Sequence, residues 1–156
     1  MNATAKTDKC AECVHAECRK DYGRGPWDNE PDRVEFEHAG LHCLLHRSWL
    51  GFWCGYVGVE KNHPFYGVSR HDLPNLSVHG GKVTYTDACE GAICHVPKPG
   101  ESEHLWWIGF DCGCGFDLIP RLHRDLQTRI RPTYRDLKYV REQTERLANQ
   151  IASVQG

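Results

Sequence analysis

Apolar and polar side chains alternate from Arg33 onward, along residues 33–45, with the period of β-strands. One face of each of the first two predicted strands is formed by Val34, Phe36 and His38 and by Leu41, Cys43 and Leu45. Ala39-Gly40 between them predicts a tight hairpin turn. A third strand is predicted at about residues 52–59. It ends at Asn62-His63-Pro64, because proline cannot donate to a strand ladder.

Two more strands are predicted further along the chain. Val83 and Tyr85 indicate a fourth, and residues 104–110 indicate a fifth. Because strand side chains alternate between two faces, one face of the fifth strand should hold Leu105, Trp107, Gly109 and Asp111, and the other Trp106, Ile108 and Phe110. Asp111 is therefore expected where a buried strand meets solvent.

Residues 134–154 show the period of an amphipathic helix. Their apolar stripe, at steps of three and four residues, consists of Leu137, Val140, Thr144, Leu147, Ile151 and Val154. Pro132-Thr133 precedes it, so Thr133 is the predicted N-cap, with Asp136 as an acidic residue in the first turn. A stripe this narrow and barely three heptads long favours packing on the protein's own sheet. A homodimer seam is the alternative.

These elements predict an α+β fold, with a mostly antiparallel sheet and a long C-terminal amphipathic helix. A chain of 156 residues suits one domain, which we place at residues 33–156. Residues 1–32 show no strand pattern and contain three cysteines and a Gly-Arg-Gly-Pro linker. They are predicted to be a separate Cys-containing N-terminal extension.

Cysteine usage and hydropathy indicate the compartment. Nine cysteines, an odd number, combine with an N-terminus that lacks the apolar core of a signal peptide. We therefore expect a reducing cytosol, in which the thiols are free or bind metal. No apolar run approaches the roughly 20 residues that span a bilayer, so no membrane association is expected.

Charge is distributed unevenly along the chain. The net charge is −2, but residues 121–141 hold seven Lys and Arg against two acidic residues. Arg121 and Arg124 in this segment are candidates to bind the phosphates of a nucleotide or nucleic acid. The alternative, which charge runs favour in general, is a solvated helix face that balances an acidic body.

A group of metal-ligating residue types lies between residues 79 and 117. It comprises His79, Asp111, Cys112, Cys114 and Asp117, with His63 as a further contributor. Imidazole, carboxylate and thiolate bind zinc or a similar divalent transition metal, and a catalytic site needs three ligands and an open position for water. Gly80 and Gly81 would let the backbone approach a ligand. In the alternative interpretation these groups only cap turns and fill space.

Two other cysteine groups match the ligand spacing of metal sites less well. Cys10 and Cys13 have the separation of a zinc-binding pair, and Cys18 follows, but a fourth ligand would have to come from elsewhere in the fold. Thiols without a function are the alternative. Cys89-x4-Cys94-His95 could form a small metal clip, although chance clustering is favoured in a chain this rich in Cys and His.

Aromatic side chains between residues 49 and 66 could stack on a base, but most are expected in the core. Tyr56 and Tyr66, beside Gly and His-Pro, are the exceptions. With His63, they are predicted to contact a ligand.

Several short motifs occur in a characteristic order: residues 55–59, 63–67, 78–81, 84–85, 107–112 and 134–136. Over about residues 33–152 the chain resembles a widespread family of uncharacterised small proteins encoded by tailed bacteriophages and prophages. In that pattern Phe-Asp-Cys is followed by a histidine and then an aspartate, and the matching positions here are Cys114 and Asp117. A thiolate in place of imidazole keeps a soft-metal ligand but does not favour proton transfer there.

The resemblance implies a small protein made in the host cytosol during infection, which counters a host defence or acts on nucleotides. In one hypothesis His79, Asp111, Cys114 and Asp117 hold a metal that activates water for hydrolysis, with His79, Asp111 and Asp117 catalytic. Arg121, Arg124 and the helix N-terminus near Thr133 would orient the anionic substrate. In the other, a non-catalytic anti-defence binder sequesters a nucleotide-like ligand or a host protein. A purely structural metal is a third interpretation.

Overall fold

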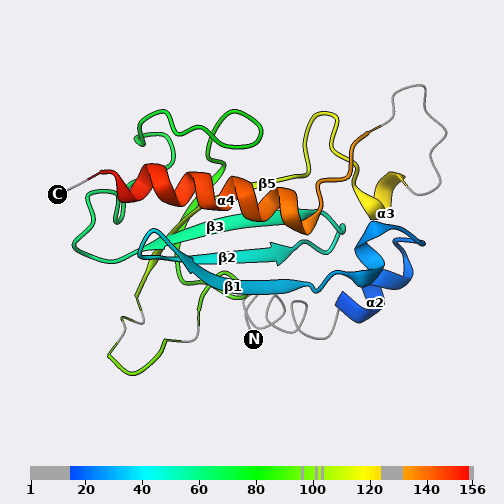
Figure 1. Cartoon of the computed structure of the whole chain (residues 1–156), viewed down its shortest axis with the longest axis horizontal. Coiled ribbons are helices and arrows are strands. Elements are labelled where there is room, and N and C mark those ends of the chain that lie inside the picture. Colours follow the sequence, from blue (N-terminus) through cyan, green and yellow to red (C-terminus); the bar gives the residue numbers. More distant parts are fainter. Residues whose placement is uncertain (1–14, 96, 101, 103, 124–131, 155–156) are drawn as a thin grey trace.

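The computed structural model describes residues 15–95, 97–100, 102, 104–123 and 132–154 (Figure 1). Its elements, in chain order, are helix α2 (His15–Lys20), 3-10 helix η2 (Pro26–Asn29), strands β1 (Arg33–His38), β2 (Leu41–Arg47), β3 (Trp53–Val59), β4 (Tyr85–Ala88) and β5 (Trp106–Asp111), and helices α3 (Pro120–His123) and α4 (Leu137–Ala152).

The strands form one antiparallel sheet in the order β1-β2-β3-β5-β4, so that β5 lies between β3 and β4. At the predicted hairpin turn, Ala39 and Gly40 have φ angles of 55° and 76°. Positive φ at both central residues is what a tight two-residue turn between twisted strands requires. Val83 precedes β4 and is buried in the core. The sheet and its helix confirm the predicted α+β fold.

Helix α4 covers one face of the sheet, as Figure 1 shows, and contacts β1, β2 and β3. Its buried side chains are Val140, Thr144, Leu147, Ala148 and Ile151. Full burial of one such aliphatic side chain contributes roughly 1.5–3 kcal/mol. The stripe therefore packs on the protein's own sheet, as the narrow pattern indicated. Beneath the helix, a Cβ built on Gly55 would lie 2.2 Å from Thr144 Oγ1, so only glycine allows this close approach.

The alternation predicted for β5 is confirmed. Ile108 and Phe110 belong to the core under α4. Leu105 and Trp107 belong to a second cluster on the opposite face, together with Tyr56.

Helix α4 begins later than the sequence predicted. Asp136, and not Thr133, is its N-cap, because Asp136 has extended backbone geometry and its Oδ1 accepts from the Tyr139 N–H at 2.8 Å. Thr133 instead exchanges backbone hydrogen bonds with the loop after β5, from its N–H to Phe116 O and from the Leu118 N–H to its carbonyl, both at 2.7 Å.

Replacing Asp136 with alanine should lower the free energy of unfolding by about 1 kcal/mol, because the cap bond is lost. Thr133→Ala, at the position that the sequence suggested, should change it by less than about 0.5 kcal/mol, as for an ordinary exposed site. Urea unfolding of both variants measures the difference. Equal losses would contradict the observed start of the helix.

The described part of the predicted N-terminal extension, from His15 onward, contacts the rest of the protein. Cys18, Tyr22 and Trp27 form a buried cluster against which Leu118 and Tyr134 pack. The Tyr22 hydroxyl donates to the carbonyls of Ser48 and Trp49 at 3.3 and 3.2 Å. Residues 15–32 thus share a core with the segment that leads into α4.

Arg47, at the end of β2, is fully buried in a polar network that joins this cluster to the sheet. Its guanidinium donates to Asp32 Oδ1 at 2.9 Å, Glu30 Oε1 at 3.2 Å and the Gly51 carbonyl at 2.7 Å. Burial alone would raise the pKa of Glu30, but hydrogen bonds from Tyr134, the Leu137 N–H and other donors lower it. The network therefore holds Glu30 as a carboxylate.

Cysteine pairing differs in part from the expected free thiols. Cys89 and Cys94 form a disulfide. In the part of the chain that the structure describes, the free thiols are Cys18, Cys43, Cys54, Cys112 and Cys114. Within the same residues, no helix is both long and apolar enough to cross a membrane.

Candidate metal centre

Two loops meet beside the N-terminal half of α4 (Figure 1). The segment between β3 and β4, green in Figure 1, runs along the helix, and Ser77 and Gln150 exchange hydrogen bonds there at 2.7 Å. The loop after β5, yellow in Figure 1, approaches the same side near the start of α4. His79 from the first loop and Asp117 from the second lie in contact.

His79 follows the buried Val78 and precedes a turn of two glycines. Gly80 and Gly81 have φ angles of 83° and 95°, which favour glycine, and the Gly81 N–H donates to the Val78 carbonyl at 2.9 Å. A Cβ built on Gly80 would lie 3.5 Å from Cys114 Sγ. The turn therefore carries His79 directly up to the loop after β5.

Both nitrogens of the His79 imidazole are hydrogen-bonded. Nε2 lies 2.7 Å from Asp117 Oδ2, and Nδ1 lies 2.6 Å from the Tyr139 hydroxyl. An ionised carboxylate only accepts, so Nε2–H donates to Asp117 and, in the neutral ring, Nδ1 accepts from Tyr139. Partial burial raises the pKa of Tyr139 and keeps this donor protonated, although Arg135 acts in the opposite direction.

Asp117 is the buried centre of the group, with 2% of its side chain exposed. Besides His79, its carboxylate accepts from Arg135 Nε at 2.9 Å on Oδ1 and from the Cys114 N–H at 3.2 Å on Oδ2. The bridge between Asp117 and Thr133 fixes its backbone next to the residues that precede α4. A buried carboxylate with these donors is held in one orientation.

Cys114 contributes an exposed thiol at the solvent-facing edge of the group, its rim. Its Sγ lies 4.0 Å from Asp117 Oδ2, and one donor atom from each of His79, Cys114 and Asp117 lies within 4.8 Å of the others. Desolvation, and then the carboxylates of Asp111 and Asp117, raise the pKa of this thiol. Cys114 is therefore a poor nucleophile by itself, whereas a cation would favour its thiolate.

The three donors fit a zinc-like divalent ion. Zinc takes imidazole, thiolate and carboxylate, and three protein ligands leave a position for water at the exposed rim. With Nε2 as ligand, the imidazole would carry its proton on Nδ1 and donate it to the Tyr139 oxygen. A hydrogen bond of this kind, from the second ring nitrogen, normally orients a histidine ligand. The group can therefore hold a metal ion.

Asp111 and Cys112 are not brought into this group. The Asp111 carboxylate accepts from Thr84 Oγ1 at 3.3 Å and from the Gly113 N–H at 3.0 Å. Cys112 is buried in the core, where desolvation raises the pKa of its thiol. Asp111 thus shapes the start of the loop, and its predicted catalytic and ligating roles find no support in these contacts.

The predicted ligand-contacting residues of β3 and the following loop lie elsewhere. Tyr56 is in the core on the face opposite α4, with its ring 5.2 Å from that of Tyr85, so the contacts that the structure shows for it are packing contacts. His63 accepts from the Phe65 N–H at 3.0 Å, so its Nε2–H donates to the Ile151 carbonyl at 2.9 Å. It contacts α4 twelve residues beyond Tyr139, or about 18 Å along the helix. Its role is to fix the end of α4.

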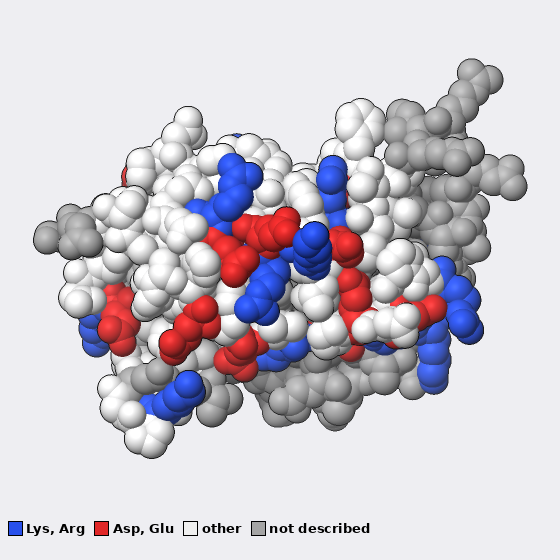
Figure 2. Space-filling view, viewed as in Figure 1, with Lys and Arg blue, Asp and Glu red and all other residues white. Residues whose placement is uncertain are grey.

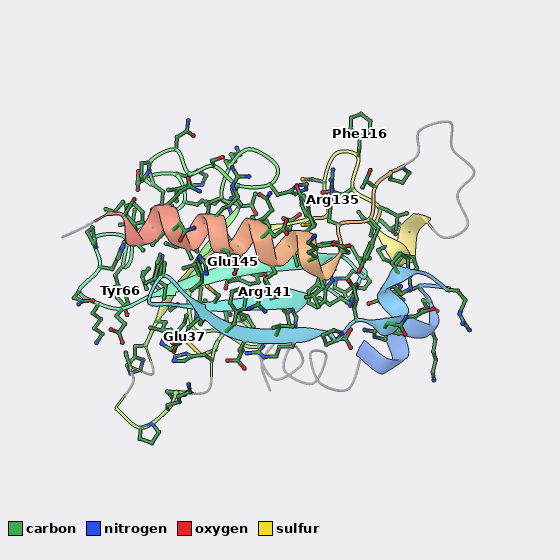
Figure 3. The ribbon with its side chains drawn as sticks, viewed as in Figure 1. Glu37, Tyr66, Phe116, Arg135, Arg141 and Glu145 are labelled. Carbon is green, nitrogen blue, oxygen red and sulfur yellow. A yellow bond between two sulfur atoms is a disulfide. The ribbon has the colours of Figure 1, made fainter. Side chains whose placement is uncertain are left out.

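Tyr66 and Arg121 are also separate from the centre. Tyr66 packs against Trp106, and Figure 3 shows Tyr66 and Arg135 toward opposite ends of α4. Arg121 forms an ion pair with Asp21 at 3.2 Å and lies over the Trp49 ring at 5.0 Å. Cys18 is buried with Tyr22 and Trp27. Cys10, Cys13 and Arg124 lie outside the described residues.

Two residues of the centre were missed in the sequence. Arg135 and Tyr139 are four residues apart, and the Arg135 guanidinium lies 4.9 Å from the centre of the Tyr139 ring. Arg135 lies just before the N-cap Asp136, and Tyr139 lies in the first turn of α4. No signal in the sequence indicated that these two residues would meet the loop after β5.

The basic residues within α4 do not form a uniform basic surface. Figure 2 shows acidic and basic side chains interleaved over the face that contains the helix. Lys138 lies 3.9 Å from Glu142, and Arg141 lies 4.0 Å from Glu145. For these two residues the interpretation as a solvated helix face is the better one, while Arg135 belongs to the centre.

Comparisons of the chain with protein-family models, with curated proteins and with solved structures found no match. The function is therefore inferred from the geometry of the site.

Proposed function

We propose that the protein is a metal-dependent hydrolase of an anionic substrate, with His79, Cys114 and Asp117 as its metal ligands. The observation that carries this proposal is the convergence of three different ligand types within 4.8 Å, one of them at the exposed rim. When bound, zinc or a similar ion would lower the pKa of a water molecule and supply a nucleophile at neutral pH.

The surrounding residues have distinct roles in this proposal. His79 and Asp117 would both bind the ion, and the Tyr139 oxygen would accept from Nδ1–H and so fix the tautomer of the imidazole, which makes Tyr139 a positioning residue. Arg135 is 28% exposed beside the centre, and a guanidinium binds phosphate or carboxylate oxygens. Figure 3 shows Phe116 at the outer tip of the same loop, pointing away from the ribbon. With 67% exposure, it could stack on an aromatic base.

These features favour a nucleotide or a signalling nucleotide as substrate. In the context implied by the resemblance to phage proteins, its hydrolysis in the host cytosol would counter a nucleotide-dependent defence. The chemistry alone supports the anion and the aromatic group, and the biological setting rests on the resemblance.

To test the proposal, the full chain loaded with zinc is incubated with nucleoside phosphates and cyclic nucleotides, then denatured, and the small molecules are separated. Altered nucleotide, lost in His79→Ala and retained in His71→Ala, would support hydrolysis. His71 is an exposed histidine outside the centre and serves as the matched control. Intact nucleotide released in stoichiometric amount would overturn the hydrolase in favour of a binder. Chelation that lowers only the melting temperature would overturn it in favour of a structural metal.

Zinc affinity should rise about tenfold per pH unit between about pH 7 and 8.5, because the Cys114 thiol, whose pKa is raised, must lose its proton to bind. Zinc titrations against a competing chelator at three pH values measure the slope. Cys114→His is the informative control, since an imidazole retains a ligand but removes the thiol proton. Its slope should be markedly shallower. Identical slopes would show that Cys114 does not bind the ion.

A further inference from the structure

Cys89, Cys94 and His95 form a second group of metal-ligating side chains. Cys89 directly follows β4, and the donor atoms of all three residues lie within 4.8 Å of one another. The two sulfurs are joined as a disulfide. The sequence suggested chance clustering, but the fold places the imidazole beside the pair.

The group lies over the face of the sheet opposite α4. Cys89 and Ile93 pack against the cluster that contains Trp107. His95, 8% exposed, has its ring 4.7 Å from that of His42 on β2 and 6.0 Å from that of Trp107 on β5. It is therefore screened from solvent on the sheet side.

Trp107 donates from Nε1 to Cys89 Sγ at 3.4 Å. Trp107 is fully buried, so this indole N–H is fixed in direction. An N–H donor stabilises a thiolate more than a neutral sulfur, because hydrogen bonds to charged acceptors are stronger. Such outer donors are typical partners of metal-bound ligands.

The loop has anchors other than the disulfide. Glu90 and Ile93 exchange backbone hydrogen bonds at 3.1 and 3.0 Å. Arg33, at the start of β1, donates to the carbonyls of Ala92 and Cys94. Opening the disulfide would therefore leave the three ligating side chains close together.

We propose that Cys89, Cys94 and His95 form a second metal site, for zinc or another thiophilic divalent ion, which the disulfide closes and reduction opens. A dithiol reductant supplies two electrons and two protons. The Cys89–Cys94 bond breaks, two thiols form, and the dithiol becomes a disulfide. Metal binding then releases both thiol protons to solvent. Two thiolates neutralise a divalent ion, which suits a largely buried site.

A bound metal would fasten this loop to the sheet in a reducing compartment, as the disulfide does in an oxidising one. The site uses no residue of the centre at His79. The proposal of a second metal site is therefore independent of the proposed hydrolase.

The test uses the full chain carrying Cys10→Ser, Cys13→Ser and Cys114→Ser, so that the only other thiols are the buried Cys18, Cys43, Cys54 and Cys112. One portion is reduced with a dithiol and one is left oxidised, and both are dialysed against buffered zinc without oxygen. Elemental analysis should find about one zinc per chain in the reduced portion and far less in the oxidised one. No zinc in the reduced portion, or equal zinc in both, would overturn the proposal.

Cobalt(II) then identifies the ligands, because thiolate ligands give a charge-transfer absorption. In the same background, Cys94→Ser and His95→Gln should each weaken cobalt binding by at least about tenfold, and Cys94→Ser should also reduce this absorption. His95→Gln keeps both thiols and provides a second reading should Cys94→Ser fold poorly. Unchanged binding in either folded variant would overturn the assigned ligand set.

Discussion

Arg47→Met is expected to lower the free energy of unfolding by about 3–5 kcal/mol, because it removes one partner from a buried ionic network. Methionine fills much of the volume but leaves Glu30 and Asp32 without the guanidinium that binds both. The loss also removes the cation over the Trp53 ring, whose centre lies 4.5 Å from Arg47 Cζ. Urea unfolding followed by tryptophan fluorescence measures the change.

Arg141→Met is the matched control for this substitution. Arg141 is 46% exposed, and its ion pair with Glu145 spans 4.0 Å. Both residues lie beside β1, where Arg141 Cζ is 4.1 Å from the centre of the Phe36 ring and Glu145 lies 3.3 Å from His38, so the control also loses a cation over an aromatic ring (Figure 3). An exposed pair of this kind contributes about 0–1 kcal/mol. Similar losses for the two variants would contradict the view that Arg47 joins the N-terminal cluster to the sheet through compensated buried charge.

The fold could be predicted from the sequence where periodicity is strong. The hairpin at Ala39-Gly40, the alternation in β5 and the stripe of α4 all arise from residues whose side chains must be buried on one face. The start of α4 could not be predicted in this way. Thr133 and Asp136 are both acceptable caps, and the backbone pairing of Thr133 with Phe116 and Leu118 decided between them.

The candidate site was predicted in part, for a similar reason. Residue type alone suggested His79, Cys114 and Asp117, which the loops do bring together. Asp111 was added because it ends a buried strand, yet strand alternation puts it on the face of Trp107, away from α4. Tyr139 comes from the first turn of α4 and Arg135 from the residues just before it. No local pattern indicates that this helix begins beside a loop twenty residues earlier in the chain.

The disulfide, too, could not be predicted from the sequence. A separation of five residues allows Cys89 and Cys94 to meet, but a reducing compartment argued against a bond. What brings His95 to them is its packing between His42 and Trp107, which belong to different strands. Contacts of this kind depend on the order of strands in the sheet, and the spacing of cysteines along the chain gives no information on that order.

Asp117→Asn should strongly weaken zinc binding at the His79 centre, because Asp117 is proposed as a ligand. The loss should exceed the about 10- to 100-fold that follows when a group that only hydrogen-bonds to a ligand is removed. Asparagine keeps the shape of the side chain but removes the charge that both the ion and Arg135 require. Competition with a chromophoric chelator measures the affinity. The measurement uses protein carrying Cys89→Ser and Cys94→Ser, so that only one of the two described donor groups remains.

Asp111→Asn makes the same chemical change six residues earlier, at the end of β5. Because Asp111 lies outside the donor group and bonds to Thr84 and Gly113, zinc affinity should change by less than about threefold, as for a partly exposed charge nearby. Equal losses in the two variants would mean that the summed negative charge of the loop, and not coordination by Asp117, attracts the ion. A large loss confined to Asp117→Asn would instead identify this buried carboxylate as the ligand around which His79, Arg135 and Cys114 are arranged.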